Sequence, residues 1–106
     1  MGKYLLEVNY SSDGLKAVVA KGGSARKATA QAAAKSVGGK VESFYFAFGG
    51  TDAYVVVDLP DNAAAAALAL AVSSSGLAAI RTSVLLTPDE VDAAVAKKVN
   101  YKPSVS

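Results

Sequence analysis

Two side chains near the middle of the chain have the chemistry to move a proton. Asp52 follows the pair Gly49-Gly50, and Tyr54 stands two residues further on. A carboxylate and a phenol act as general base or acid when they face a shared pocket. The alternative for Asp52 is that it accepts backbone hydrogen bonds and steadies a turn. Asp52 and Tyr54 are the catalytic candidates of this sequence.

The absence of histidine and cysteine limits the reactions that this chain could catalyse. The chain has no histidine and no cysteine, so it lacks the commonest general base, a thiolate nucleophile and the strongest ligands for transition metals. We therefore expect no metal site and no cofactor. A serine nucleophile is also disfavoured, because it would need a neighbouring base of the histidine type.

A larger set of polar and aromatic side chains shares one face of the expected sheet. In one register of the strand alternation, this set is Glu7, Asn9, Tyr45, Tyr54, Asp58 and Arg81. Apolar walls with a few fixed hydrogen-bonding groups are typical of a small-molecule cavity. The alternative is a partly polar dimer interface in which Glu7 and Arg81 neutralise each other across neighbouring strands. The sequence leaves both interpretations open.

A candidate anion site follows the glycine pair Gly22-Gly23, at Ser24 and Arg26. Free backbone amides at a helix start attract anions, and a guanidinium adds a bidentate fork. The run lacks the fixed spacing of a phosphate-binding P-loop, and no strand leads directly into it. The competing interpretation is a helix break in which Ser24 caps the second segment.

The elements that position these residues follow from hydrophobic alternation and from turn signals. Strands are expected over 3–10, 41–48, 51–59 and 78–87, and helices from about 12, over 25–37, 63–73 and 88–99. Gly22-Gly23 breaks the first helical stretch in two. Gly49-Gly50 predicts a hairpin with a type I′ turn, in which both central residues need positive φ. Thr87-Pro88-Asp89-Glu90 has the pattern of a capping box.

This order of elements predicts an α+β, ferredoxin-like split βαβ fold. Two βαβ units form one four-stranded antiparallel sheet, and both main helices cover the same face. In either register the other face carries aromatic residues, either Tyr45 and Tyr54 or Phe44, Phe46 and Phe48. Soluble monomers rarely expose so large an apolar patch. We therefore expect a homodimer or higher homo-oligomer that associates through this face.

Length and charge limit the remaining classes of protein. The 106 residues form one domain over 1–99, with 100–106 expected as a flexible tail. A net charge of +2 with scattered basic residues argues against a nucleic-acid partner. The N-terminus reaches the carboxylate of Glu7 after only a few apolar residues, so we expect no signal-peptide core. The most apolar stretch, Ala63–Val72, is too short to span a bilayer. We expect a cytoplasmic protein with no membrane partner.

Three blocks of sequence resemble one known family. They are Gly22-Gly23-Ser24-Ala25-Arg26-Lys27, the segment from Gly38-Gly39 to Phe48-Gly49, and Leu85-Leu86-Thr87-Pro88-Asp89-Glu90. In order and spacing they resemble the GYD domain family over roughly 3–99. The tripeptide that names the family falls on Gly50-Thr51-Asp52, with threonine where tyrosine is usual. The resemblance implies a dimeric α+β barrel made by two facing sheets, and it implies no established activity.

Three functions remain open at this point. The first is a binding module, a homodimer whose facing sheets enclose a small, partly aromatic ligand. The second is a cofactor-independent enzyme, monooxygenase-like or isomerase-like, in which a carboxylate or tyrosine moves a proton. The third is a structural role in which the uncovered face serves only for assembly.

Overall fold

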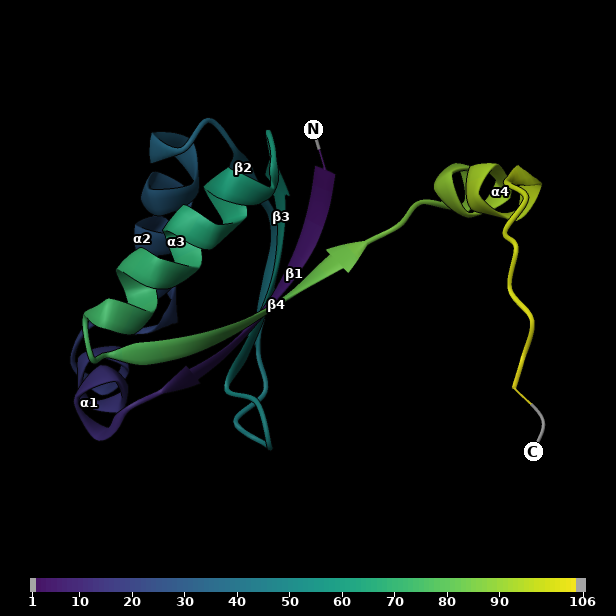
Figure 1. Ribbon diagram of the computed structural model, residues 1–106. Helices are drawn as coiled ribbons and strands as arrows, with labels where there is room; N and C mark the ends of the chain where they lie inside the picture. The colour runs from purple at the N-terminus through teal and green to yellow at the C-terminus, as the bar shows by residue number, and fades with distance from the viewer. Residues whose placement is uncertain (1, 105–106) are drawn as a thin grey trace.

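The computed structural model describes residues 2–104 and alternates strands and helices along the chain (Figure 1). In chain order the elements are β1 Gly2–Tyr10, α1 Ser12–Lys21, α2 Gly23–Ser36, β2 Lys40–Phe46, β3 Ala53–Leu59, α3 Asn62–Ser74, β4 Ala78–Leu85 and α4 Pro88–Ala96. This order confirms the predicted α+β, ferredoxin-like fold, with the first helical stretch divided into α1 and α2.

The four strands form one antiparallel sheet in the order β2-β3-β1-β4. α1, α2 and α3 lie on one side of this sheet (Figure 1). The two central strands alternate strictly, and the buried positions of β1 and β3 form the core beneath the helices. These core positions are Tyr4, Leu6, Val8, Ala53, Val55, Val57 and Leu59. The alternate positions of the same strands therefore face away from α1, α2 and α3.

The break between α1 and α2 lies at Gly22, which has φ 83°. Ser11 caps α1, because its Oγ accepts the backbone N–H of Gly14 at 3.2 Å. The prediction that Ser24 caps the second segment was wrong. α2 begins at Gly23, its N-cap position is Gly22, and no side chain bonds to this helix start. The left-handed glycine reverses the chain so sharply that the helix resumes at once, which leaves Ser24 inside the first turn.

The hairpin between β2 and β3 has a wider loop than predicted. β2 ends at Phe46 and β3 begins at Ala53, and positive φ occurs at Phe48 (54°) rather than at Gly49 or Gly50. The type I′ prediction was therefore wrong, although the antiparallel pairing of the two strands is confirmed. Two interactions close the wider loop. The carbonyl oxygen of Asp52 accepts the N–H of Ala47 at 2.9 Å, and the rings of Phe46 and Phe48 stack with centroids 5.4 Å apart.

Each of the two C-terminal helices begins at a side-chain cap. The Asp61 side chain accepts the N–H of Ala64 at 2.8 Å at the start of α3. The capping box of α4 is confirmed, because Thr87 Oγ1 accepts the N–H of Glu90 at 3.1 Å and the Glu90 carboxylate accepts the N–H of Thr87 at 2.9 Å. α4 ends at Ala96, before the predicted 99, because Lys97 has extended backbone.

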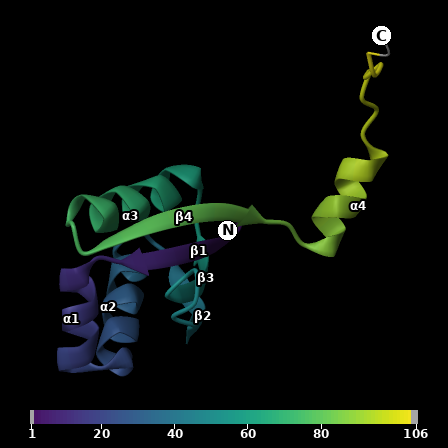
Figure 2. The same cartoon turned by 90° about the horizontal axis from the view of Figure 1, so that it is seen from below.

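Residues 86–104, here called the C-terminal arm, stand away from the rest of the chain (Figures 1 and 2). The arm continues from β4 and carries α4 to the side of the sheet opposite α2 and α3 (Figure 1). Its apolar side chains at Leu86, Val91 and Val95 are exposed. Flexibility of residues 100–106 stays a prediction, and residues 105 and 106 lie outside the described part.

Candidate functional site

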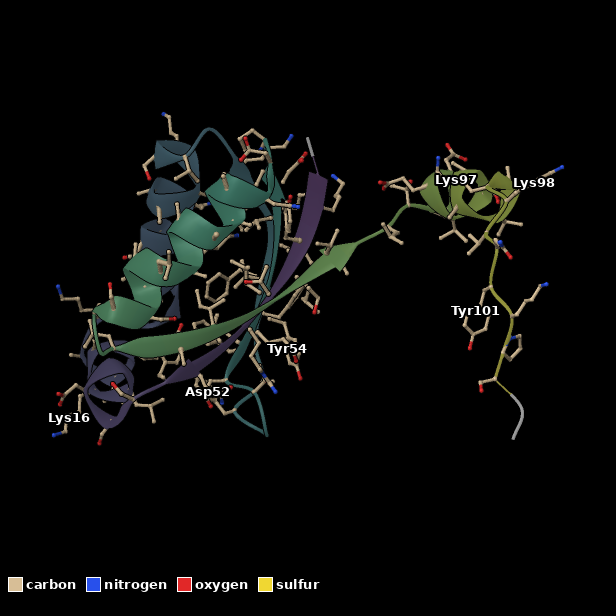
Figure 3. The ribbon with its side chains drawn as sticks, viewed as in Figure 1. Lys16, Asp52, Tyr54, Lys97, Lys98 and Tyr101 are labelled. Carbon is tan, nitrogen blue, oxygen red and sulfur yellow. The ribbon has the colours of Figure 1, made fainter. Side chains whose placement is uncertain are left out.

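The face of the sheet that α1, α2 and α3 leave uncovered is called the open face. Phe44 and Phe46 pack against the core, so the register that points Tyr45 and Tyr54 away from the helices is the one adopted. The strand pairings place all six predicted ligand-binding residues on the open face, namely Glu7, Asn9, Tyr45, Tyr54, Asp58 and Arg81. Figure 3 shows Tyr54 on the side of the sheet away from the helices.

Four of these residues form one row across the whole sheet. Tyr45 on β2 pairs with Tyr54 on β3, Tyr54 with Glu7 on β1, and Glu7 with Arg81 on β4. Directly paired side chains on one sheet face lie in contact range. Asn9 lies two positions further along β1. Asp58 stands four residues from Tyr54, about 13 Å along the strand, so the structure does not bring it into the row.

The Arg81 end of the row is tied to the hairpin loop. Arg81 Nη2 lies 3.5 Å from Glu7 Oε1 and donates to Thr51 Oγ1 at 2.9 Å. Asn9 Nδ2 donates to the carbonyl oxygen of Gly50 at 3.0 Å. Sequence reasoning missed Thr51, which is buried. Its position could have drawn attention to it, because Thr51 is the middle residue of Gly50-Thr51-Asp52, where tyrosine is usual in the family that the sequence resembles.

Asp52 is held by backbone groups rather than aimed at Tyr54. Its Oδ2 accepts the N–H of Tyr10 at 2.9 Å, and its own N–H donates to the carbonyl oxygen of Val8 at 2.9 Å. No hydrogen bond joins Asp52 to Tyr54 within residues 2–104. This arrangement favours the structural interpretation, in which Asp52 fixes the loop against the end of β1 (Figure 3).

A second polar group lies at the far end of the open face. Lys3 donates to the Glu42 carboxylate, and its Nζ lies 3.5 Å from Asp58 Oδ2. The hydrogen bond to Glu42 is the main reason that the pKa of Lys3 is raised. Asp58 Oδ1 is buried and has no hydrogen-bond partner among the described residues.

The predicted anion pair Ser24 and Arg26 does not converge. Ser24 is exposed in the first turn of α2, whereas Arg26 lies toward the sheet with its guanidinium carbon 5.8 Å from the centre of the Tyr10 ring. Arg26 Nε is buried without a hydrogen-bond partner in the described part of the chain. Sequence reasoning missed the Tyr10 contact, because the pattern does not reveal which helix face meets the end of β1.

Tyr10 should make the folded protein less stable at alkaline pH. Burial raises the pKa of Tyr10 above 10.0, although the neighbouring Arg26 acts to lower it. A pKa raised by folding stabilises the protein below the unfolded value, and that stabilisation is lost as pH rises through the folded value. We expect the Tyr10→Phe variant to lose less stability than the wild type above about pH 10. Denaturant unfolding of both proteins at several pH values measures this, and a constant difference between them would contradict it.

Within residues 2–104, no group of three or more His, Cys, Asp or Glu side chains is placed to hold a metal ion. None of the helices in this range combines the length and the apolar character that crossing a bilayer requires.

Comparison with known proteins adds one finding to this geometry. No curated protein and no solved structure gives a significant match. The family model described as GYD domain matches residues 4–95, a span that contains all of the row on the open face and most of α4. Because this match covers most of the chain, the protein belongs to the GYD domain family.

Proposed function

We propose that the protein is a homodimeric binding module whose two open faces enclose a small, partly aromatic ligand. The observation that carries this proposal is the row of Tyr45, Tyr54, Glu7 and Arg81 across all strands of the sheet. Tyr45 is 71% exposed in a single chain. Two phenol rings beside an ion pair supply both the apolar contact and the fixed polar groups that a small aromatic ligand needs.

Burial supports the pairing of two copies through this face. Leu5 and Val56 occupy its centre and are only half-buried in one chain. A second copy related by a two-fold axis presents the same apolar and polar groups in return.

The C-terminal arm supports the same arrangement. α4 stands on the open-face side of the sheet and at a distance from it (Figure 1). Val91 and Val95 lie four residues apart on one side of α4, with 44% and 79% of their surfaces exposed. A second copy seated on the open face would lie between the sheet and α4. Both valines would then gain an apolar partner.

The geometry favours binding over catalysis. The Asp52 carboxylate accepts a backbone N–H, and Glu7 lies beside the Arg81 guanidinium. Both carboxylates are therefore engaged by donors of this chain, which favours a positioning role over that of a general base. The enzyme hypothesis then rests on Tyr54, whose cross-strand neighbour Glu7 is already paired with Arg81. We rank it second.

Native mass spectrometry of the freshly purified protein tests the proposal. We expect a dimer that carries a small molecule, which denaturation releases and which rebinds when added back. Arg81→Gln removes a charged donor at the end of the row and should weaken rebinding about tenfold or more. Thr82→Ala changes the opposite face of the same strand and should leave rebinding unchanged.

Two outcomes would contradict the binding module. A dimer that never carries or takes up a small molecule would leave only the assembly role. Chemical conversion of the carried molecule, lost in Asp52→Asn or Tyr54→Phe while binding persists, would establish the enzyme hypothesis instead.

A further inference from the structure

A cavity lies on the helical side of the sheet, away from the open face. α2 packs mainly on β2 and α3 on β4, and the cavity of about 80 Å³ lies between these helices and the central strands. The α2 residues that line it include Ala30 and Ala33, whose side chains are too small to reach across. Most of the remaining walls are apolar: Leu6, Val8, Val55, Val57, Leu68 and Ile80.

Arg26 is the one charged residue among the described residues that line this cavity. Its Nε is buried and has no hydrogen-bond partner within residues 2–104, and it forms no ion pair with any residue of that range. The guanidinium carbon of Arg26 lies over the Tyr10 ring, 5.8 Å from the ring centre, in a cation–π contact. The two Nη groups of a guanidinium can together donate to both oxygens of one carboxylate.

The surroundings favour a carboxylate over a metal or a cation. Burial raises the pKa of the Tyr10 hydroxyl, so near neutral pH this group keeps the proton that it can donate. Thr29 Oγ1 already donates to the carbonyl oxygen of Ala25 at 3.0 Å, so the side-chain donors left for a ligand in the cavity are those of Arg26 and Tyr10. The neighbouring Asp52 carboxylate is engaged by the N–H of Tyr10. Arg26 therefore has no competing anion bonded to it in the described part of the chain.

The volume sets the size of the apolar part of the ligand. An apolar protein cavity of about 150 Å³ holds benzene. A cavity of about half that volume accepts a tail of about three or four carbon atoms. An aromatic ring or a long fatty chain is too large without movement of α2 or α3.

We propose that this cavity binds a short aliphatic carboxylate, with the carboxylate on Arg26 and the hydrocarbon tail between α2, α3 and the sheet. The site uses neither the open face nor the C-terminal arm. It is therefore independent of the proposed dimer and of the ligand proposed there.

Calorimetric titration and two-dimensional NMR of the full chain test this proposal with butyrate as the probe. We expect saturable binding, with the largest amide shifts at Ala30, Ala33 and Val72. Acetate lacks the tail and 1-butanol lacks the carboxylate, so each should bind more weakly by about tenfold or more. Equal binding of butyrate and 1-butanol would overturn the role of Arg26, and shifts confined to Tyr54 and Val56 would overturn the site.

Matched variants separate this site from general effects of charge. Arg26→Gln should weaken butyrate binding about tenfold or more, whereas Lys27→Gln, an exposed neighbour on the same helix, should not change it. Ala33→Leu fills the cavity while leaving Arg26 in place and should also abolish binding. Retained affinity in Ala33→Leu, or in a folded Arg26→Gln variant, would overturn the proposal, and so would an absence of saturable butyrate binding to the wild type.

Discussion

Val56→Asp should convert the proposed homodimer into a folded monomer. Val56 lies on the open face of β3, between Leu5 on β1 and Ser43 on β2. In the proposed dimer a carboxylate at this position is removed from water without a cation beside it. The two-fold axis repeats the change in both copies, and each unpaired buried charge costs several kcal/mol. This loss exceeds what the polar contacts at the rim of the face can offset.

The matched control is Ala66→Asp, which adds the same charge at an exposed position on α3, on the helical side. Light scattering after size exclusion should give half the wild-type mass for Val56→Asp and the full mass for Ala66→Asp. Circular dichroism should show that both variants remain folded. A dimeric Val56→Asp protein would mean that the open face is not the interface.

Gly14→Ala should be among the most destabilising substitutions in the chain. Gly14 is buried in the first turn of α1, and a Cβ there would overlap the carbonyl oxygen of Leu77 and lie 3.2 Å from Tyr10 Cβ. The same carbonyl accepts the N–H of Ser11 at 2.9 Å, so it cannot move without breaking the contact between α1 and the start of β4. We expect a loss of about 3 kcal/mol in the free energy of unfolding.

Gly49→Ala is the matched control for that loss. Gly49 is exposed in the hairpin loop, and no atom lies within 4 Å of a Cβ built there. The free energy of unfolding of the Gly49→Ala variant should stay within about 0.5 kcal/mol of the wild-type value. Urea unfolding of both variants measures the difference. Similar stabilities of the two variants would show that α1 can shift on the sheet, and with it Tyr10 beside the Arg26 cavity.

The sequence predicted the elements whose signals are local. The alternation in β1 separates Tyr4, Leu6 and Val8 from Glu7 and Asn9, and the structure places these two sets on opposite faces of the sheet. The capping box of α4 is equally local, because the side chains of Thr87 and Glu90 each accept the other residue's backbone N–H within one turn. For these elements, backbone geometry and side-chain chemistry point to the same structure.

The failures occur where side-chain and loop contacts that no sequence pattern encodes decide the conformation. Gly49-Gly50 favours a tight turn, but stacking of Phe48 on Phe46 and the Asp52 carbonyl close a wider loop. The contact of Arg81 with Thr51 joins residues far apart in sequence, and no period in the sequence encodes it. The same holds for Arg26 above Tyr10, since the sequence does not fix how α2 is rotated on the sheet.

The native mass of the intact chain, measured by light scattering over a wide range of protein concentration, tests the central claim most directly. Coverage of the open face by a second copy predicts twice the mass of one chain at every concentration above the dissociation constant, with Tyr45 and Tyr54 protected from chemical modification. A folded monomer at high concentration, with both tyrosines freely modified, would contradict the claim.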